Sequence, residues 1–115
     1  MNEKTKEDLT PQGIYDYLMS KPADIKGFAK DFKMAFKVHI ERPENAQYFL
    51  KTGKVQLDST LLGAEYFKGD ARDESYRLLP PYENWLNQNN WDVTYNYPSG
   101  SQTTVLLKPI KPIKK

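Results

Sequence analysis

The chain has 115 residues, a formal net charge of +2 and no cysteine. A single domain of this length can bury a sufficient core without covalent staples. The absence of cysteine excludes disulfides, zinc–thiolate sites and thiol catalysis, and it favours a reducing compartment, so we expect the cytoplasm. The polar segment from Met1 to Asp8 lacks the apolar stretch of a signal peptide. Apolar runs stay far below the roughly 20 residues of a membrane span.

The chain is predicted to begin with two helices. Residues 1–9 are expected to form a mobile lead-in. Thr10 and Pro11 are typical of an N-cap followed by the first helical position, and this helix should end near Lys21. A second helix follows from about Pro22, because apolar residues recur at helical spacing at Ile25, Phe28, Ala29 and Phe32.

The period of the pattern then changes from 3.6 to 2. The segment Phe36–Glu41 alternates apolar and polar residues, which predicts a half-buried strand. Residues 42–45 are typical of a turn with proline at its second position. Gln47–Lys51 and Lys54–Leu57 are predicted to pair as a hairpin. A short helix beginning at Pro43 is the alternative for the first of these two segments.

The second half is predicted to hold a helix and a further hairpin. Residues 58–79 show little beyond a helical turn around Leu61–Phe67 and a charged loop over 68–74. A helix is expected from Pro81 to Asn89, with Tyr82, Trp85 and Leu86 on one face. Trp91–Tyr97 alternates strictly, a turn follows at 98–100, and Thr103–Leu107 returns as the partner strand.

These elements give the order α-α-β-β-β-α-β-β. Such an order is typical of an α+β fold, an antiparallel sheet with helices packed on one face. One domain is expected over residues 10–108, followed by an extended basic tail over 109–115.

The sequence offers one candidate catalytic pair. His39 is the single histidine, and Glu41 would share its strand face and could orient the ring as a general base. No serine or threonine is placed by the sequence as its nucleophile. The acidic cluster Asp70, Asp73 and Glu74 lacks the alternating ligands of a calcium loop, so a solvated loop is preferred. We therefore predict no catalytic, cofactor-binding or metal-binding residue, and an enzyme using His39 and Glu41 is an alternative.

The predicted second hairpin has an aromatic face. Trp91, Val93, Tyr95 and Tyr97 lie on the same side of their strand, because strand side chains alternate. Packing beneath a helix is the structural interpretation. The functional interpretation is a surface that stacks on bases or contacts a protein, and in it Tyr95 and Tyr97 bind the partner.

The tail repeats Lys-Pro-Ile with a period of three. Its prolines favour an extended polyproline II conformation, which has three residues per turn. With this period, three lysines align along one edge of the extended chain, namely Lys108, Lys111 and Lys114. A solubilising tail is one interpretation, and an arm that docks on an acidic, partly apolar partner is the other.

Together these features favour a small non-enzymatic domain that binds a macromolecular partner, by preference a protein. The residues assigned to the partner are Tyr95, Tyr97, Lys108, Lys111, Lys114 and Lys115. A module for single-stranded nucleic acid, a small enzyme and a structural subunit of an assembly are the alternatives. Small free-standing domains are frequent among accessory and inhibitor proteins of phages and mobile elements, which makes such an origin a candidate. No membrane partner and no cofactor are expected.

Overall fold

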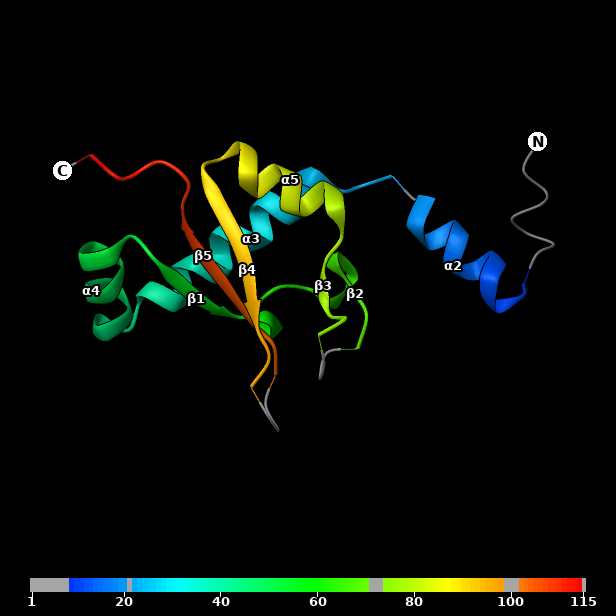
Figure 1. The fold of residues 1–115 in the computed structure, drawn as a ribbon, viewed down its shortest axis with the longest axis horizontal. Coiled ribbons are helices and arrows are strands. Elements are labelled where there is room, and N and C mark those ends of the chain that lie inside the picture. Colours follow the sequence, from blue (N-terminus) through cyan, green and yellow to red (C-terminus); the bar gives the residue numbers. More distant parts are fainter. Residues whose placement is uncertain (1–8, 21, 71–73, 99–101, 115) are drawn as a thin grey trace.

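The computed structural model describes residues 9–20, 22–70, 74–98 and 102–114. The described residues form an α+β fold whose centre is a three-stranded antiparallel sheet, as expected (Figure 1). The strands lie in the order β1 (Val55–Asp58), β5 (Thr104–Pro109) and β4 (Trp91–Asn96). A separate antiparallel pair joins the two-residue strands β2 (Phe67–Lys68) and β3 (Arg77–Leu78).

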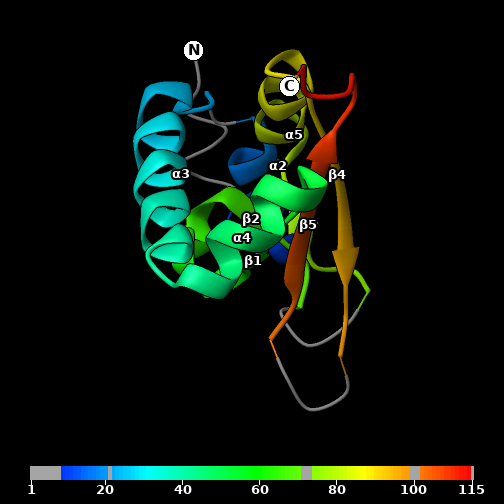
Figure 2. The same cartoon turned by 90° about the vertical axis from the view of Figure 1, so that its left-hand side faces the viewer.

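One face of the sheet carries the core. Register places Leu107 between Val55 and Val93, so these side chains point to the same side. Helix α3 (Ile25–Ile40) lies against that side, as the turned view shows (Figure 2). Helix α5 (Pro80–Gln88) adds Tyr82 and Leu86 to the same buried cluster.

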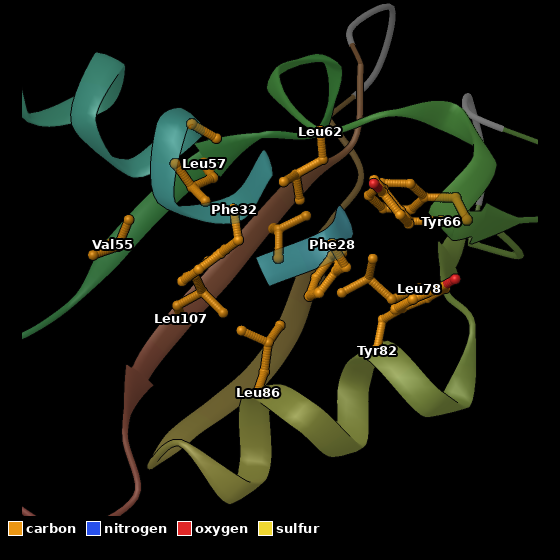
Figure 3. Close-up of a cluster of buried hydrophobic side chains, with 13 residues drawn as sticks. Phe28, Phe32, Val55, Leu57, Leu62, Tyr66, Leu78, Tyr82, Leu86 and Leu107 are labelled. Carbon is orange, nitrogen blue, oxygen red and sulfur yellow. The ribbon is translucent and has the colours of Figure 1, made fainter. Parts of the chain in front are cut away.

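Phe28 lies at the centre of this core. It is fully buried, and side chains from the helices, the sheet and the 58–79 segment surround it (Figure 3). Its ring centroid lies 4.9 Å from that of Tyr82, 5.0 Å from that of Tyr66 and 5.7 Å from that of Trp85. The helical spacing that predicted Phe28 and Phe32 as core residues is confirmed.

The strand predicted over Phe36–Glu41 is wrong, because α3 continues to Ile40. Phe36 extends the row begun by Phe28 and Phe32, and its ring lies 6.1 Å from that of Phe32. The polar–apolar alternation is therefore a coincidence within a longer helix. Val38 is half-exposed on α3.

The hairpin predicted from Gln47 is also wrong, and its alternative is confirmed. Helix α4 covers Pro43–Thr52, with Arg42 at the N-cap and proline in the first turn. Gly53 ends it at φ +75°, where its N–H donates to the carbonyl oxygen of Phe49 at 2.7 Å. Strand β1 then begins at Val55, close to the predicted Lys54.

The remaining elements follow the prediction closely. Helix α2 covers Pro11–Ser20, α5 begins one residue before the predicted Pro81, and β4 and β5 pair as a hairpin. The helical turn expected around Leu61–Phe67 is present as two 3₁₀ turns, η1 (Ser59–Leu61) and η2 (Ala64–Tyr66). Three predicted segments lie wholly or partly outside the described residues: 1–8 of the lead-in predicted over 1–9, 71–73 of the charged loop, and most of the turn at 98–100.

Candidate functional site

Helix α2 leaves its apolar side chains in solvent. Thr10 caps it, because its side-chain oxygen accepts from the Gly13 N–H at 3.1 Å. None of the residues Pro11–Ser20, all of which the structure describes, is buried. The large apolar side chains are between 39% and 55% exposed, at Ile14, Tyr15, Tyr17, Leu18 and Met19. An isolated helix of this length is marginal in water, so α2 needs a surface that covers its apolar side.

A groove of about 520 Å³ separates α2 from the rest of the domain. Its α2 wall consists of Tyr15, Leu18 and Met19, which follow one another at helical spacing. The opposite wall consists of residues from η2, β2 and the start of α5, namely Tyr66, Phe67, Leu79 and Tyr82. The groove therefore has two largely apolar walls, one from the isolated helix and one from the core.

The core-side wall is held by hydrogen bonds. The Tyr66 hydroxyl donates to Asp31 on α3 at 2.6 Å, and the Asp24 N–H donates to the Tyr82 hydroxyl at 3.0 Å. Asp24 also caps α3 by accepting from the Gly27 N–H at 3.0 Å. Burial, followed by the hydrogen bond to Asp31, raises the pKa of Tyr66 well above its usual range. This wall presents a fixed shape to any ligand.

Among the described residues that line the rim of the groove, acidic side chains outnumber basic ones. Asp24 and Glu65 line it, and Lys68 is the one cation in this described set. The only charged residue within α2 is Asp16, which accepts a hydrogen bond from Gln12 on the polar side of the helix. An apolar segment flanked by cations would complement this rim better than one flanked by anions.

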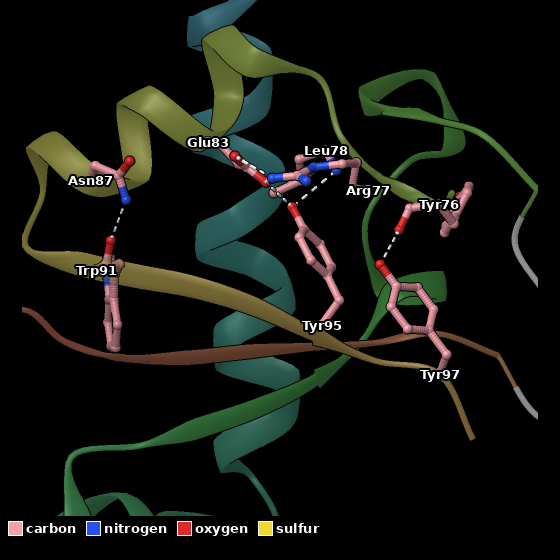
Figure 4. Close-up of polar contacts among 8 residues, drawn as sticks. All are labelled: Tyr76, Arg77, Leu78, Glu83, Asn87, Trp91, Tyr95 and Tyr97. Atoms are coloured by element: carbon pink, nitrogen blue, oxygen red, sulfur yellow. Dashed lines mark hydrogen bonds and ion pairs between the residues drawn. The ribbon is translucent and has the colours of Figure 1, made fainter. Parts of the chain in front are cut away.

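The tyrosines predicted to face a partner have their hydroxyls engaged inside the domain (Figure 4). The Tyr95 hydroxyl donates to Glu83 on α5 and accepts from the Leu78 N–H at 3.0 Å. The Tyr97 hydroxyl donates to the carbonyl oxygen of Tyr76 at 2.9 Å. Burial, followed by the hydrogen bond to Glu83, raises the pKa of Tyr95. The Tyr95 hydroxyl therefore links β4 to α5 and β3, and the Tyr97 hydroxyl links the residue after β4 to the residue before β3. Contact of either tyrosine with a partner stays a prediction.

The predicted tail begins as part of the sheet. Strand β5 ends at Pro109 rather than at Leu107 or Lys108, and Pro109 lies opposite Trp91. Proline is tolerated because the pairing with β1 stops at Leu107, so only one neighbouring strand remains. Asn90, at φ +70°, then exchanges two hydrogen bonds with the Lys111 backbone, at 2.9 Å and 3.1 Å.

The tail lysines occupy different surroundings. Lys108 lies 3.8 Å from Asp92 across the hairpin, and both side chains are about half-exposed. Lys111 and Lys114 are exposed, and Lys115 lies outside the described residues. Their role in partner binding stays a prediction.

His39 and Glu41 do not share a strand face. His39 lies in the last turn of α3, whereas Glu41 is the residue that caps the helix. The Asn45 side chain donates to the His39 carbonyl oxygen at 2.9 Å, and partial burial lowers the pKa of the His39 ring. Two residues apart on a helix, the two side chains point in different directions, so the arrangement expected for a general base is absent here.

The groove wall from η2 and β2 was missed by the sequence analysis, because 58–79 carries no regular period. The exposure of α2 was also not predicted, because an amphipathic pattern indicates a helix with an apolar side but does not indicate which element covers that side.

Comparison with protein-family models, with curated proteins and with solved structures finds no match to this chain. Among the described residues, no three histidine, aspartate or glutamate side chains are grouped so that they could hold a metal ion. No helix in the described part of the chain is long and apolar enough to cross a membrane.

Proposed function

We propose that this protein is a non-enzymatic domain that binds another protein, and that α2 and the adjacent groove form its binding surface. The observation that carries the proposal is the exposure of α2. The described part of the chain buries none of its residues, and Tyr15, Leu18 and Met19 line one wall of the groove. A short helix of this kind gains stability when a partner covers it.

The partner segment that fits is an amphipathic helix with an apolar face and basic residues beside it. The apolar face would fill the space between Leu18 on α2 and Phe67 on the core side. Basic flanking residues would lie near Asp24 and Glu65, where electrostatic complementarity favours them. The rim charges also disfavour a second copy of this chain, because like charges would then meet.

Two synthetic amphipathic peptides test the proposal. Both carry the same leucine face, and one is flanked by lysines and the other by glutamates. We expect the lysine-flanked peptide to bind more tightly in isothermal titration calorimetry. Leu18→Asp should abolish this binding, because it introduces a charge into the groove wall. Gln12→Glu is the matched control, since it adds the same charge on the polar side of α2.

A charge reversal on the rim distinguishes specific binding at this groove from nonspecific hydrophobic binding. Glu65→Lys should weaken binding of the lysine-flanked peptide and strengthen that of the glutamate-flanked peptide. Equal binding by the native protein and Leu18→Asp would refute the proposal. Self-association that depends on Leu18, seen by analytical ultracentrifugation, would show that the occupant is a second copy instead.

A further inference from the structure

Helix α3 carries a row of lysines on the side that faces away from the core. They lie at positions i, i+4, i+7 and i+11, and we call them the lysine row: Lys26, Lys30, Lys33 and Lys37. At about 100° per residue they fall within an arc of about 60°, and they extend over about 16 Å of helix. All four are exposed, whereas Phe28, Phe32 and Ala35 on the opposite side are buried.

The charge of this row is uncompensated. None of the four lysines forms an ion pair with any other residue in the described part of the chain. Each is three or four positions from another lysine, a spacing at which like charges repel on a helix surface. Glu41 is the single acidic residue at such a spacing, four positions after Lys37. Repulsion along a folded helix is relieved when an anionic ligand lies along it.

We propose that the lysine row binds the phosphate backbone of a nucleic-acid duplex. A straight row of about 16 Å spans about five base pairs, at 3.4 Å per pair, so it can contact several phosphates at once. The exposed apolar residues nearest the row on α3 are Met34 and Val38, which offer no ring for stacking on bases. Contact would therefore be to phosphates and independent of sequence, which favours a duplex over a single strand.

This site is distinct from the groove beside α2. The groove is lined by Asp24, at the N-cap of α3, and by residues of η2, β2 and α5, none of which belongs to the lysine row. The proposal also differs from the tail lysines, which follow β5. Each surface can therefore be tested without altering the other.

The test is a salt titration of binding to a fluorescent DNA duplex of about two helical turns. For four phosphate contacts, the logarithm of the affinity should fall with the logarithm of the salt concentration at a slope of about −3.6. Between about 50 mM and 200 mM salt this slope corresponds to a loss of about 150-fold. Lys30→Ala combined with Lys33→Ala should halve the slope and reduce the loss to about 10-fold.

The matched control removes the same charge outside α3. Lys51 and Lys54 are exposed at the end of α4 and just before β1, and they belong neither to the lysine row nor to the tail, so replacing both with alanine should leave the slope unchanged. Circular dichroism and melting would confirm that both double variants are folded. An equal loss in the control, or no binding at the lowest salt, would overturn the proposal. So would tighter binding to the single strand of the same length, or equal binding to polyglutamate, which would indicate an acidic protein partner.

Discussion

Phe28→Ala is the most direct test of the fold. The Phe28 ring is fully buried at the point where α3, α5 and the 58–79 segment meet (Figure 3). It contacts four aromatic rings, with centroids between 4.9 Å and 6.2 Å away. Truncation to alanine would leave a cavity among large rings, which cannot collapse into it without moving the backbone of two helices.

The expected loss of unfolding free energy follows from this environment. Truncating a buried phenylalanine costs about 3–5 kcal/mol. Aromatic pairs add about 0.5–1.5 kcal/mol each beyond buried area, so the loss at Phe28 should lie in the upper part of that range. Small domains have a total stability of about 5–15 kcal/mol, so the variant should be close to unfolding at 37 °C.

Urea unfolding followed by tryptophan fluorescence measures this loss, with the denaturant slope unchanged. Met34→Ala is the matched control on the same helix, because Met34 is 58% exposed, and it should change stability by less than about 0.5 kcal/mol. If Phe28→Ala does not fold, Phe28→Leu keeps the test usable with a smaller loss in the same direction. A loss below about 1 kcal/mol for Phe28→Ala would refute the packing described here.

Three further predictions concern the hairpin and the tail. Tyr95→Phe should cost about 1–3 kcal/mol, because it removes the hydrogen bond to Glu83. Because folding raises the pKa of Tyr95, this residue contributes to the free energy of unfolding below about pH 10, and the contribution is lost as the pH rises further. Tyr95→Phe should therefore make the stability fall less steeply at alkaline pH, which urea melts at several pH values would measure. Asn90→Gly should lower the melting temperature through the loss of both bonds to Lys111, and unchanged melting would show that these two side-chain bonds do not stabilise the fold. Replacing Lys111 and Lys114 with glutamate should weaken binding to an acidic peptide, the kind of partner predicted for the tail, more than replacing them with alanine. The margin should shrink as salt rises, and equal affinities would exclude this role for the tail.

The sequence predicted the elements whose signals are local. Helix α2 has a capping threonine before a proline, and the first half of α3 has a regular apolar row. The strict alternation of Trp91–Tyr97 predicted β4, because one side of that strand packs on the core and the other faces solvent. In α3 and β4 the burial pattern repeats with the period of the element itself, whereas in α2 the local signal is the cap.

The errors arose where two periods compete within a few residues. Phe36, Val38 and Ile40 alternate, yet Phe36 also lies at helical spacing from Phe28 and Phe32. The lysine row carries the missing signal, since lysines separated by three or four positions as far as Lys37 indicate that the helix continues past Phe36. The polar residues of α3, taken together with its apolar residues, therefore predict a helix over Phe36–Ile40 in place of the strand.

The segment 58–79 could not be predicted because distant residues hold it in place. Strands β2 and β3 have two residues each, too few for a period, and their position depends on contacts with other elements. The Leu78 N–H donates to the Tyr95 hydroxyl, and the Leu79 N–H donates to the Tyr66 carbonyl oxygen at 2.9 Å. The position of one wall of the candidate groove therefore depends on contacts with distant parts of the chain.

Helix α3 connects the two proposed surfaces. Its N-cap, Asp24, lies on the groove rim, and its exposed side carries the lysine row. The buried side holds Phe28, so the core fixes the orientation of both surfaces through one continuous helix. A partner segment in the groove and a duplex along the lysine row would then have a fixed position relative to each other. Cationic residues of the partner segment would be attracted to the acidic rim, and the phosphates would be attracted to the lysines. The two ligands should therefore bind together without competing. The acidic rim attracts the basic partner segment and repels phosphates, whereas the lysine row attracts phosphates and repels the basic segment.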